Sequence, residues 1–179
     1  MLNLTKYQPG AEYFRHADPA GRPEGRYAPV SVLAAIGASL CFAADVIAST
    51  GGWHWVTVVS YPSRRAFVGM ADRPDFREWH RANSDGIAEV IVMGLVPVGR
   101  VPEARSARTL LEVWHGAVPA PVADGSLSTF DVEGTILGDG RQWTGARYTS
   151  IASGTALPLR DAIPSYQALL LEPVVERWR

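Results

Sequence analysis

The stretch WHWVTVVSY, residues 53–61, is the clearest strand signal in the chain. Aromatic and β-branched residues dominate it, and neither glycine nor proline interrupts it, which is typical of a buried or half-buried β-strand. Residues 38–49 also have the composition of a buried strand, and Thr50-Gly51-Gly52 joins the two segments tightly. Residues 38–61 are therefore expected to form a β-hairpin.

Helices and strands are predicted on both sides of this hairpin. Before it come a strand over 2–7, a helix starting near Ala11 with Tyr13 and Phe14 buried, and a second helical stretch over 28–36. After it, Ser63 suits the N-cap of a helix, a further helix carries Asp75 near its start, and residues 89–98 form a strand. The order strand, helix, strand, strand, helix, strand predicts a ferredoxin-like repeat over residues 1–98.

The second half of the chain repeats this pattern in shortened form. Residues 99–108 are charged, contain proline and predict a linker. Residues 109–115 mirror the first strand, 128–137 and 142–151 mirror the hairpin, 159–168 favour a helix, and 169–178 a closing strand. We therefore expect a degenerate second ferredoxin-like repeat over 109–179. The predicted fold class is α+β, with both repeats forming a pseudo-dimeric α+β barrel in one chain.

Composition and missing motifs exclude several classes of function. The 179 residues carry a net charge of −1, so no basic field favours nucleic acid. The single cysteine, Cys41, excludes a disulfide framework and multi-cysteine metal sites. No phosphate-binding glycine loop and no HExxH motif is present, so we expect neither a cofactor nor a metal. No signal peptide and no bilayer-spanning run is found, which predicts a cytoplasmic protein without membrane contact.

A family resemblance rests on residues 61–98. The matching positions follow the pattern of a strand ending in Tyr-Pro-Ser, an apolar helix, a proline-led helix with His-Arg, and a last strand; they are Tyr61, Pro62, Ser63, Phe67, Met70, Pro74, His80 and Arg81. Asn3 and Lys6 in the first strand also have counterparts. This segment resembles an uncharacterised family of the dimeric α+β barrel superfamily. The resemblance implies a fold shared with cofactor-independent monooxygenases, lactone isomerases and haem-handling enzymes, so it favours no single reaction.

Four residues are candidates for catalysis. His80 beside Arg81 suits proton transfer next to a bound carboxylate or enolate, although the two side chains would serve equally to cap and pair within a helix. His54 alternates with Trp53 and Trp55 and so faces the opposite side of its strand. Asn3 would stabilise an oxyanion, or bond to backbone at an edge.

Aromatic residues supply the candidates for binding a substrate. Trp53, Trp55 and Tyr61 share one face of their strand and form either an aromatic wall inside the barrel or ordinary core beneath the helices. In the second arrangement His54 would face the cavity. The remaining candidates are Tyr7, His115, Trp143 and Tyr148.

Together these features predict a cofactor-free enzyme of secondary metabolism that acts on a small aromatic or polyketide-like molecule. Acid/base chemistry would give cyclisation, isomerisation or dehydration, and reaction of the same carbanion with oxygen would give a cofactor-independent monooxygenase. A non-catalytic protein that binds a small molecule is the alternative from another class, and a subunit that only stabilises a partner enzyme is a third. The oligomeric state is either a monomer with an internal pseudo-dimer or a homodimer.

Overall fold

The computed structural model describes residues 1–10, 28–99, 108–122, 127–159, 163 and 165–178. In chain order its elements are β1 (Leu2–Tyr7), α1 (Val30–Ala35), β2 (Ser39–Ser49), β3 (Trp55–Ser60), α2 (Arg64–Met70), α3 (Pro74–Asn83), β4 (Ile87–Val98), β5 (Thr109–Trp114), β6 (Leu127–Leu137), β7 (Gly145–Ser150) and β8 (Tyr166–Glu176).

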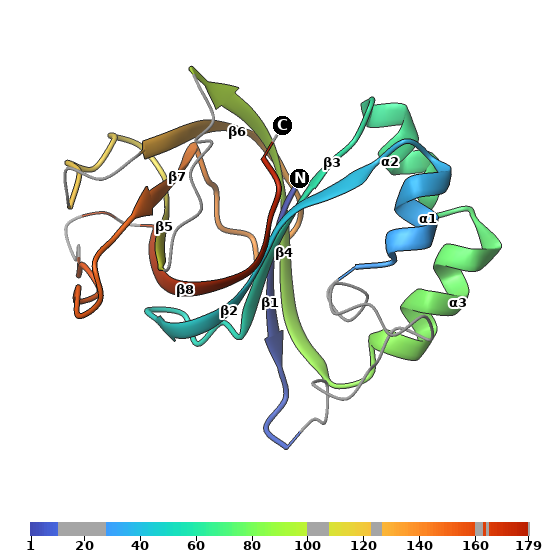
Figure 1. Ribbon diagram of the computed structural model, residues 1–179, viewed down its shortest axis with the longest axis horizontal. Helices are drawn as coiled ribbons and strands as arrows, with labels where there is room; N and C mark the ends of the chain where they lie inside the picture. Colours follow the sequence, from blue (N-terminus) through green and yellow to red (C-terminus); the bar gives the residue numbers. More distant parts are fainter. Residues whose placement is uncertain (11–27, 100–107, 123–126, 160–162, 164, 179) are drawn as a thin grey trace.

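The strands form one closed antiparallel barrel (Figure 1). Around the barrel the order is β1-β3-β2-β8-β5-β7-β6-β4, and β4 pairs with β1 to close the ring. The order β4-β1-β3-β2 in the first half recurs as β8-β5-β7-β6 in the second. Because every barrel strand has a neighbour on both sides, closure leaves no open sheet edge in this ring.

The predicted α+β fold class, with two ferredoxin-like repeats and helices covering a sheet, is wrong. The structure is a single closed eight-stranded antiparallel β-barrel in which strands far outweigh helices. The reason is edge pairing: β2 bonds to β8 and β4 bonds to β6, so the two sets of strands form one sheet. In the part of the second half that the structure describes, no helix occurs.

The predicted positions of individual helices and strands agree with the structure better than the predicted fold class does. Both predicted hairpins are confirmed, because β2 pairs with β3 and β6 with β7. Ser63 is the N-cap of α2, and its Oγ accepts a hydrogen bond of 3.1 Å from the Ala66 N–H. The predicted helix over 159–168 is wrong, since β8 already begins at Tyr166. The helix near Ala11 and most of the 99–108 linker lie outside the described residues.

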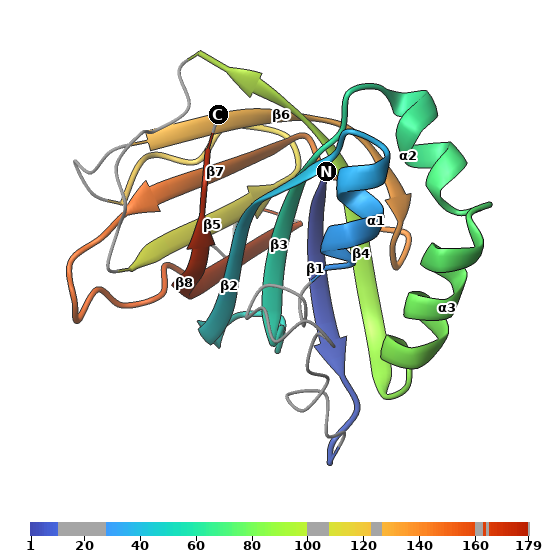
Figure 2. The same cartoon turned by 45° about the vertical axis from the view of Figure 1, so that its right-hand side comes forward.

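The three helices lie outside the barrel, on the side of β1, β2 and β3 (Figure 2). Beneath them a cluster of buried side chains joins Val32 and Leu33 of α1 and Met70 of α2 to Trp55 and Val59 of β3. A separate cluster fills the barrel itself. The helices therefore cover one outer wall, and the barrel interior is a distinct environment.

Candidate functional site: the barrel interior

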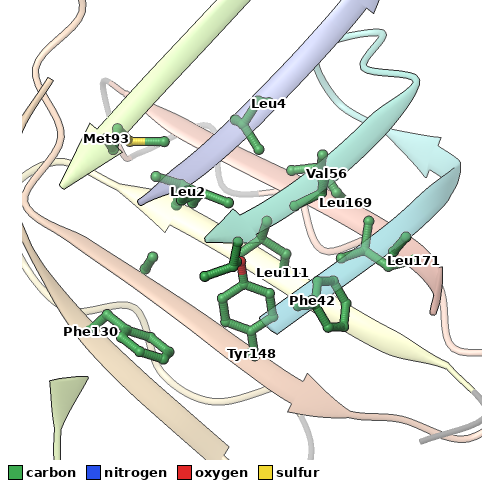
Figure 3. Packing of buried hydrophobic residues seen from close by; sticks show 14 of the residues in the cluster. Leu2, Leu4, Phe42, Val56, Met93, Leu111, Phe130, Tyr148, Leu169 and Leu171 are labelled. Carbon is green, nitrogen blue, oxygen red and sulfur yellow. The ribbon is translucent and has the colours of Figure 1, made fainter. Parts of the chain in front are cut away.

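Alternation along the strands directs one side chain in two into the barrel. Leu2 and Leu4 of β1 and Val56 and Val58 of β3 point inward, and they meet Met93, Leu111, Leu169 and Leu171 from the other strands (Figure 3). Because these side chains are almost wholly buried, the middle of the barrel is an apolar core. The two ends of the barrel differ from this middle and from each other.

Four rings pack together near the end of the barrel where β1 begins; we refer to Phe42, Phe130, Tyr148 and Trp178 as the aromatic end. The Trp178 indole is stacked on Phe42 with ring centroids 5.5 Å apart and meets Tyr148 edge-on at 5.3 Å. Phe130 lies 6.0 Å from Trp178 and 5.8 Å from Tyr148. Such offset and edge-to-face contacts are the favourable geometries for aromatic rings.

Two hydroxyl groups in this region are buried without a hydrogen-bond partner among the described residues. They are Tyr148 Oη and Ser128 Oγ. Ser128 and Tyr148 are cross-strand partners in the β6–β7 ladder and share the inward face with Phe130 and Ala146. Burial raises the pKa of Tyr148 far above its ordinary value, so the phenol stays protonated and able to donate. Buried polar groups are nearly always paired, so both hydroxyls suit a ligand or water inside the barrel.

The opposite end of the barrel, where β1 ends, carries charged side chains and is termed the polar end. Lys6 Nζ lies 3.8 Å from a Glu89 carboxylate oxygen, and Arg141 lies 3.7 Å from the other oxygen of that carboxylate. Arg141 also pairs with Asp139 in the β6–β7 connection. These ion pairs link β1, β4 and the β6–β7 connection, and each side chain is about one-third exposed, so individually they add little stability.

Two tryptophans lie below these charges in the barrel core. Trp53 Nε1 donates a 3.0 Å hydrogen bond to the side-chain oxygen of Gln167. The Arg141 guanidinium lies 5.1 Å from the ring centre of Trp143, a cation–π distance. Trp143 Nε1 is buried without a partner among the described residues. The polar end is thus closed by indole rings beneath a layer of ion pairs.

His54 lies just before β3, with its ring 6.2 Å from that of Tyr7, a residue of the cluster on the outer wall. Its Nδ1 accepts a 3.0 Å hydrogen bond from the Tyr7 N–H, so the neutral ring carries its proton on Nε2. Burial, and secondarily the positive charge of Lys6, lower the pKa of His54. These features fit a neutral imidazole that holds the end of β1 in place.

We expect the protein to lose stability as His54 takes up a proton. The folded pKa lies below the unfolded value of about 6.5, so the unfolded chain binds more protons and unfolding becomes easier as the pH falls below that value. The loss is complete below the folded pKa. Urea unfolding at pH 7.5 and pH 5 measures it, and His54→Gln should show a smaller drop than the wild type.

The control for this prediction is His115→Gln, because His115 is exposed beyond β5. Carboxylates titrate equally in all three proteins, so the difference between variants isolates the histidine. An identical pH dependence in wild type and His54→Gln would contradict the prediction.

The structure does not gather the other predicted catalytic residues inside the barrel. His80 and Arg81 are exposed on α3, where the His80 ring contacts Phe76 at 5.8 Å. Asn3 alternates with the inward-facing Leu2 and Leu4, so it points to the outer face of β1. The geometry therefore gives no support to a natural-product cyclase or isomerase built on these groups.

The predicted substrate-binding residues divide between the two environments. Trp53, Trp143 and Tyr148 lie in the barrel core, whereas Trp55, Tyr61 and Tyr7 pack on the outer wall near the helices. Tyr61 donates to Met70 Sδ at 3.7 Å, and burial raises the pKa of Tyr61 to about 12. His115 is exposed. Trp53 and Trp55 do not share a face, because β3 begins only at Trp55.

Sequence reasoning missed several residues of the site. Phe42, Ser128 and Trp178 at the aromatic end, and Glu89 and Arg141 at the polar end, were not predicted to take part. Ser128 and Phe130 lie two residues apart on a predicted strand, and this spacing could have indicated that both side chains point into the barrel. The position of Trp178 depends on barrel closure, which no local pattern encodes.

Known proteins offer no relative from which the fold or the site could be interpreted. No family model, no curated protein and no solved structure matches the sequence. Within the described ranges, no group of histidine, cysteine and acidic side chains is arranged to hold a metal ion. Among those same residues, no helix has the length and apolarity needed to cross a bilayer.

Proposed function

We propose that the barrel binds a small, largely apolar aromatic molecule at its aromatic end, without transforming it. The observation that carries this proposal is the pair of buried, unpartnered hydroxyls of Tyr148 and Ser128 on the inward face. Ligand sites typically combine apolar and aromatic walls with a few polar groups that fix orientation. Eight-stranded barrels have interiors that side chains fill or that hold one small ligand.

The chemistry of the two hydroxyls indicates what the ligand carries. The protonated Tyr148 phenol is a donor, and Ser128 offers both a donor and acceptor positions. A carbonyl oxygen on an aromatic ring would accept from either hydroxyl while the ring contacts Phe42 and Phe130. The proposed ligand is therefore an aromatic ketone, aldehyde or similar carbonyl compound.

The test compares two ligands of nearly equal shape, 2-acetylnaphthalene and 2-ethylnaphthalene, of which only the first carries an acceptor. Calorimetric titration of the wild type should show binding of both, with the acetyl compound bound about fivefold more tightly, the value of roughly one net hydrogen bond. Tyr148→Phe keeps the ring, removes the hydroxyl and should abolish most of this preference. Because that hydroxyl has no partner in the described structure, the substitution should not lower stability.

Tyr61→Phe is the matched control, because Tyr61 is a tyrosine outside the barrel whose hydroxyl already has a partner. It should leave the acetyl preference unchanged. Failure of the wild type to bind either compound would contradict the proposal. An unchanged preference in Tyr148→Phe would contradict the assigned role of Tyr148.

A further inference from the structure

We infer that the Trp178 indole occupies the position where the ligand ring binds, so that Trp178 competes with the ligand and must leave before it enters. This inference rests on the proposed function and adds to it the route of entry and the shape of the ligand. It is carried by the contacts of Trp178, by its place in the chain and by its partial exposure.

The contacts of Trp178 are those expected of a bound flat ring. Phe42 lies parallel to the indole within 25°, Phe130 within 31°, and Tyr148 stands across it at 68°. Two roughly parallel rings and one edge-on ring therefore contact a single planar group, an arrangement that favours another flat aromatic ring of similar size. Phe42, Phe130 and Tyr148 are nearly inaccessible, whereas Trp178 is only partly buried.

Trp178 can move without disrupting a strand. It follows the end of β8 at Glu176, whereas Phe42, Phe130 and Tyr148 are fixed within β2, β6 and β7. Just before Trp178, the Arg177 N–H donates a 2.7 Å hydrogen bond to the Cys41 carbonyl. This bond would hold the backbone in place while Trp178 rotates about it. Rotation of Trp178 outward would expose the three remaining rings and bring the Tyr148 hydroxyl within reach of an entering molecule.

Trp178→Ala removes the competing ring. If the indole blocks the site, this variant should bind 2-acetylnaphthalene about tenfold more tightly than the wild type and with faster association, because less of the protein is held in a closed form. In the wild type, the indole N–H resonance of Trp178 should shift toward that of an exposed tryptophan when the compound is added. Trp178→Leu provides a second variant if the alanine protein does not fold.

Trp79→Ala on α3 is the control, since it also deletes a partly buried tryptophan but lies outside the barrel, stacked with Phe76. It should bind like the wild type. Weaker binding by both Trp178 variants, with an unmoved Trp178 resonance, would overturn the inference and make the indole a wall of the site. Failure of the wild type to bind contradicts the proposed function itself, whereas binding by the wild type with no gain in the Trp178 variants contradicts only this inference.

Discussion

Replacing Arg147 with methionine is expected to lower the free energy of unfolding by about 3–5 kcal/mol, because it leaves a carboxylate buried without its charge partner. Glu112 and Arg147 face outward from β5 and β7, yet they are 0% and 3% exposed. Arg147 Nε donates to Glu112 at 2.9 Å, and Tyr166 Oη donates to the other Glu112 oxygen at 2.7 Å.

Arg147 also donates hydrogen bonds to the backbone. Nη1 donates to the Pro119 carbonyl at 2.8 Å and Nη2 to the Ala120 carbonyl at 3.2 Å, so the guanidinium fixes the segment after β5 against the barrel. The guanidinium also lies 5.5 Å from the ring centre of Trp114. Loss of Arg147 therefore breaks a whole hydrogen-bonded group rather than a single pair.

Urea unfolding of Arg147→Met and Arg64→Met compares the loss of a buried arginine with the loss of an exposed one. Arg64 pairs with Glu133 on the surface, where both side chains are largely exposed, so its loss should cost no more than about 1 kcal/mol. The double variant Glu112→Leu/Arg147→Met should be more stable than Arg147→Met alone, since it removes the stranded carboxylate. A cost below about 1 kcal/mol for Arg147→Met would contradict this account.

This ion pair illustrates what the sequence could not reveal. Glu112 and Arg147 lie 35 positions apart, and each looks like a solvent-facing charge on an alternating strand. Only the pairing of β5 with β7 makes Glu112 and Arg147 direct neighbours. Local alternation predicted that both strands exist, but not what covers their outer face.

The fold shows the same division between local and long-range information. Strand positions such as β3 and β6 follow from β-branched and aromatic runs, and the predicted bounds are close to those observed. The continuous apolar run 168–171 was divided wrongly between helix and strand, because residues 167–171 of β8 are buried on both faces and show no clear period. The α+β fold class failed for a non-local reason, namely the β2–β8 and β4–β6 pairings that close the ring.

The site was predictable only in part, because inward or outward orientation depends on where each strand begins. Trp53 precedes β3 and turns into the barrel, while Trp55 inside β3 faces the helices, so a strict two-residue alternation misplaces one of them. Tyr148 was identified as a phenolic candidate, and the structure places it in the interior. Its unpartnered hydroxyl became visible only with the packing around it.

Phe42→Ala should also cost about 3–5 kcal/mol of unfolding free energy, since it removes a fully buried ring from the barrel core. Phe42 contacts both Tyr148 at 5.4 Å and Trp178 at 5.5 Å, so its loss opens space beside the proposed ligand position. If that space accepts an aromatic ring, saturating 2-acetylnaphthalene should raise the melting temperature of this variant more than that of the wild type.

The control is Phe67→Ala, which removes a partly buried ring of α2 that packs against the outer wall. It should be less destabilising, and 2-acetylnaphthalene should raise its melting temperature no more than it raises that of the wild type. A small cost for Phe42→Ala would mean that the ring does not support the barrel core. The third outcome is a large loss of unfolding free energy with no extra rise in melting temperature on adding the compound. The space left by Phe42 beside Tyr148 would then have no affinity for an aromatic carbonyl compound, and Phe42 would serve packing alone.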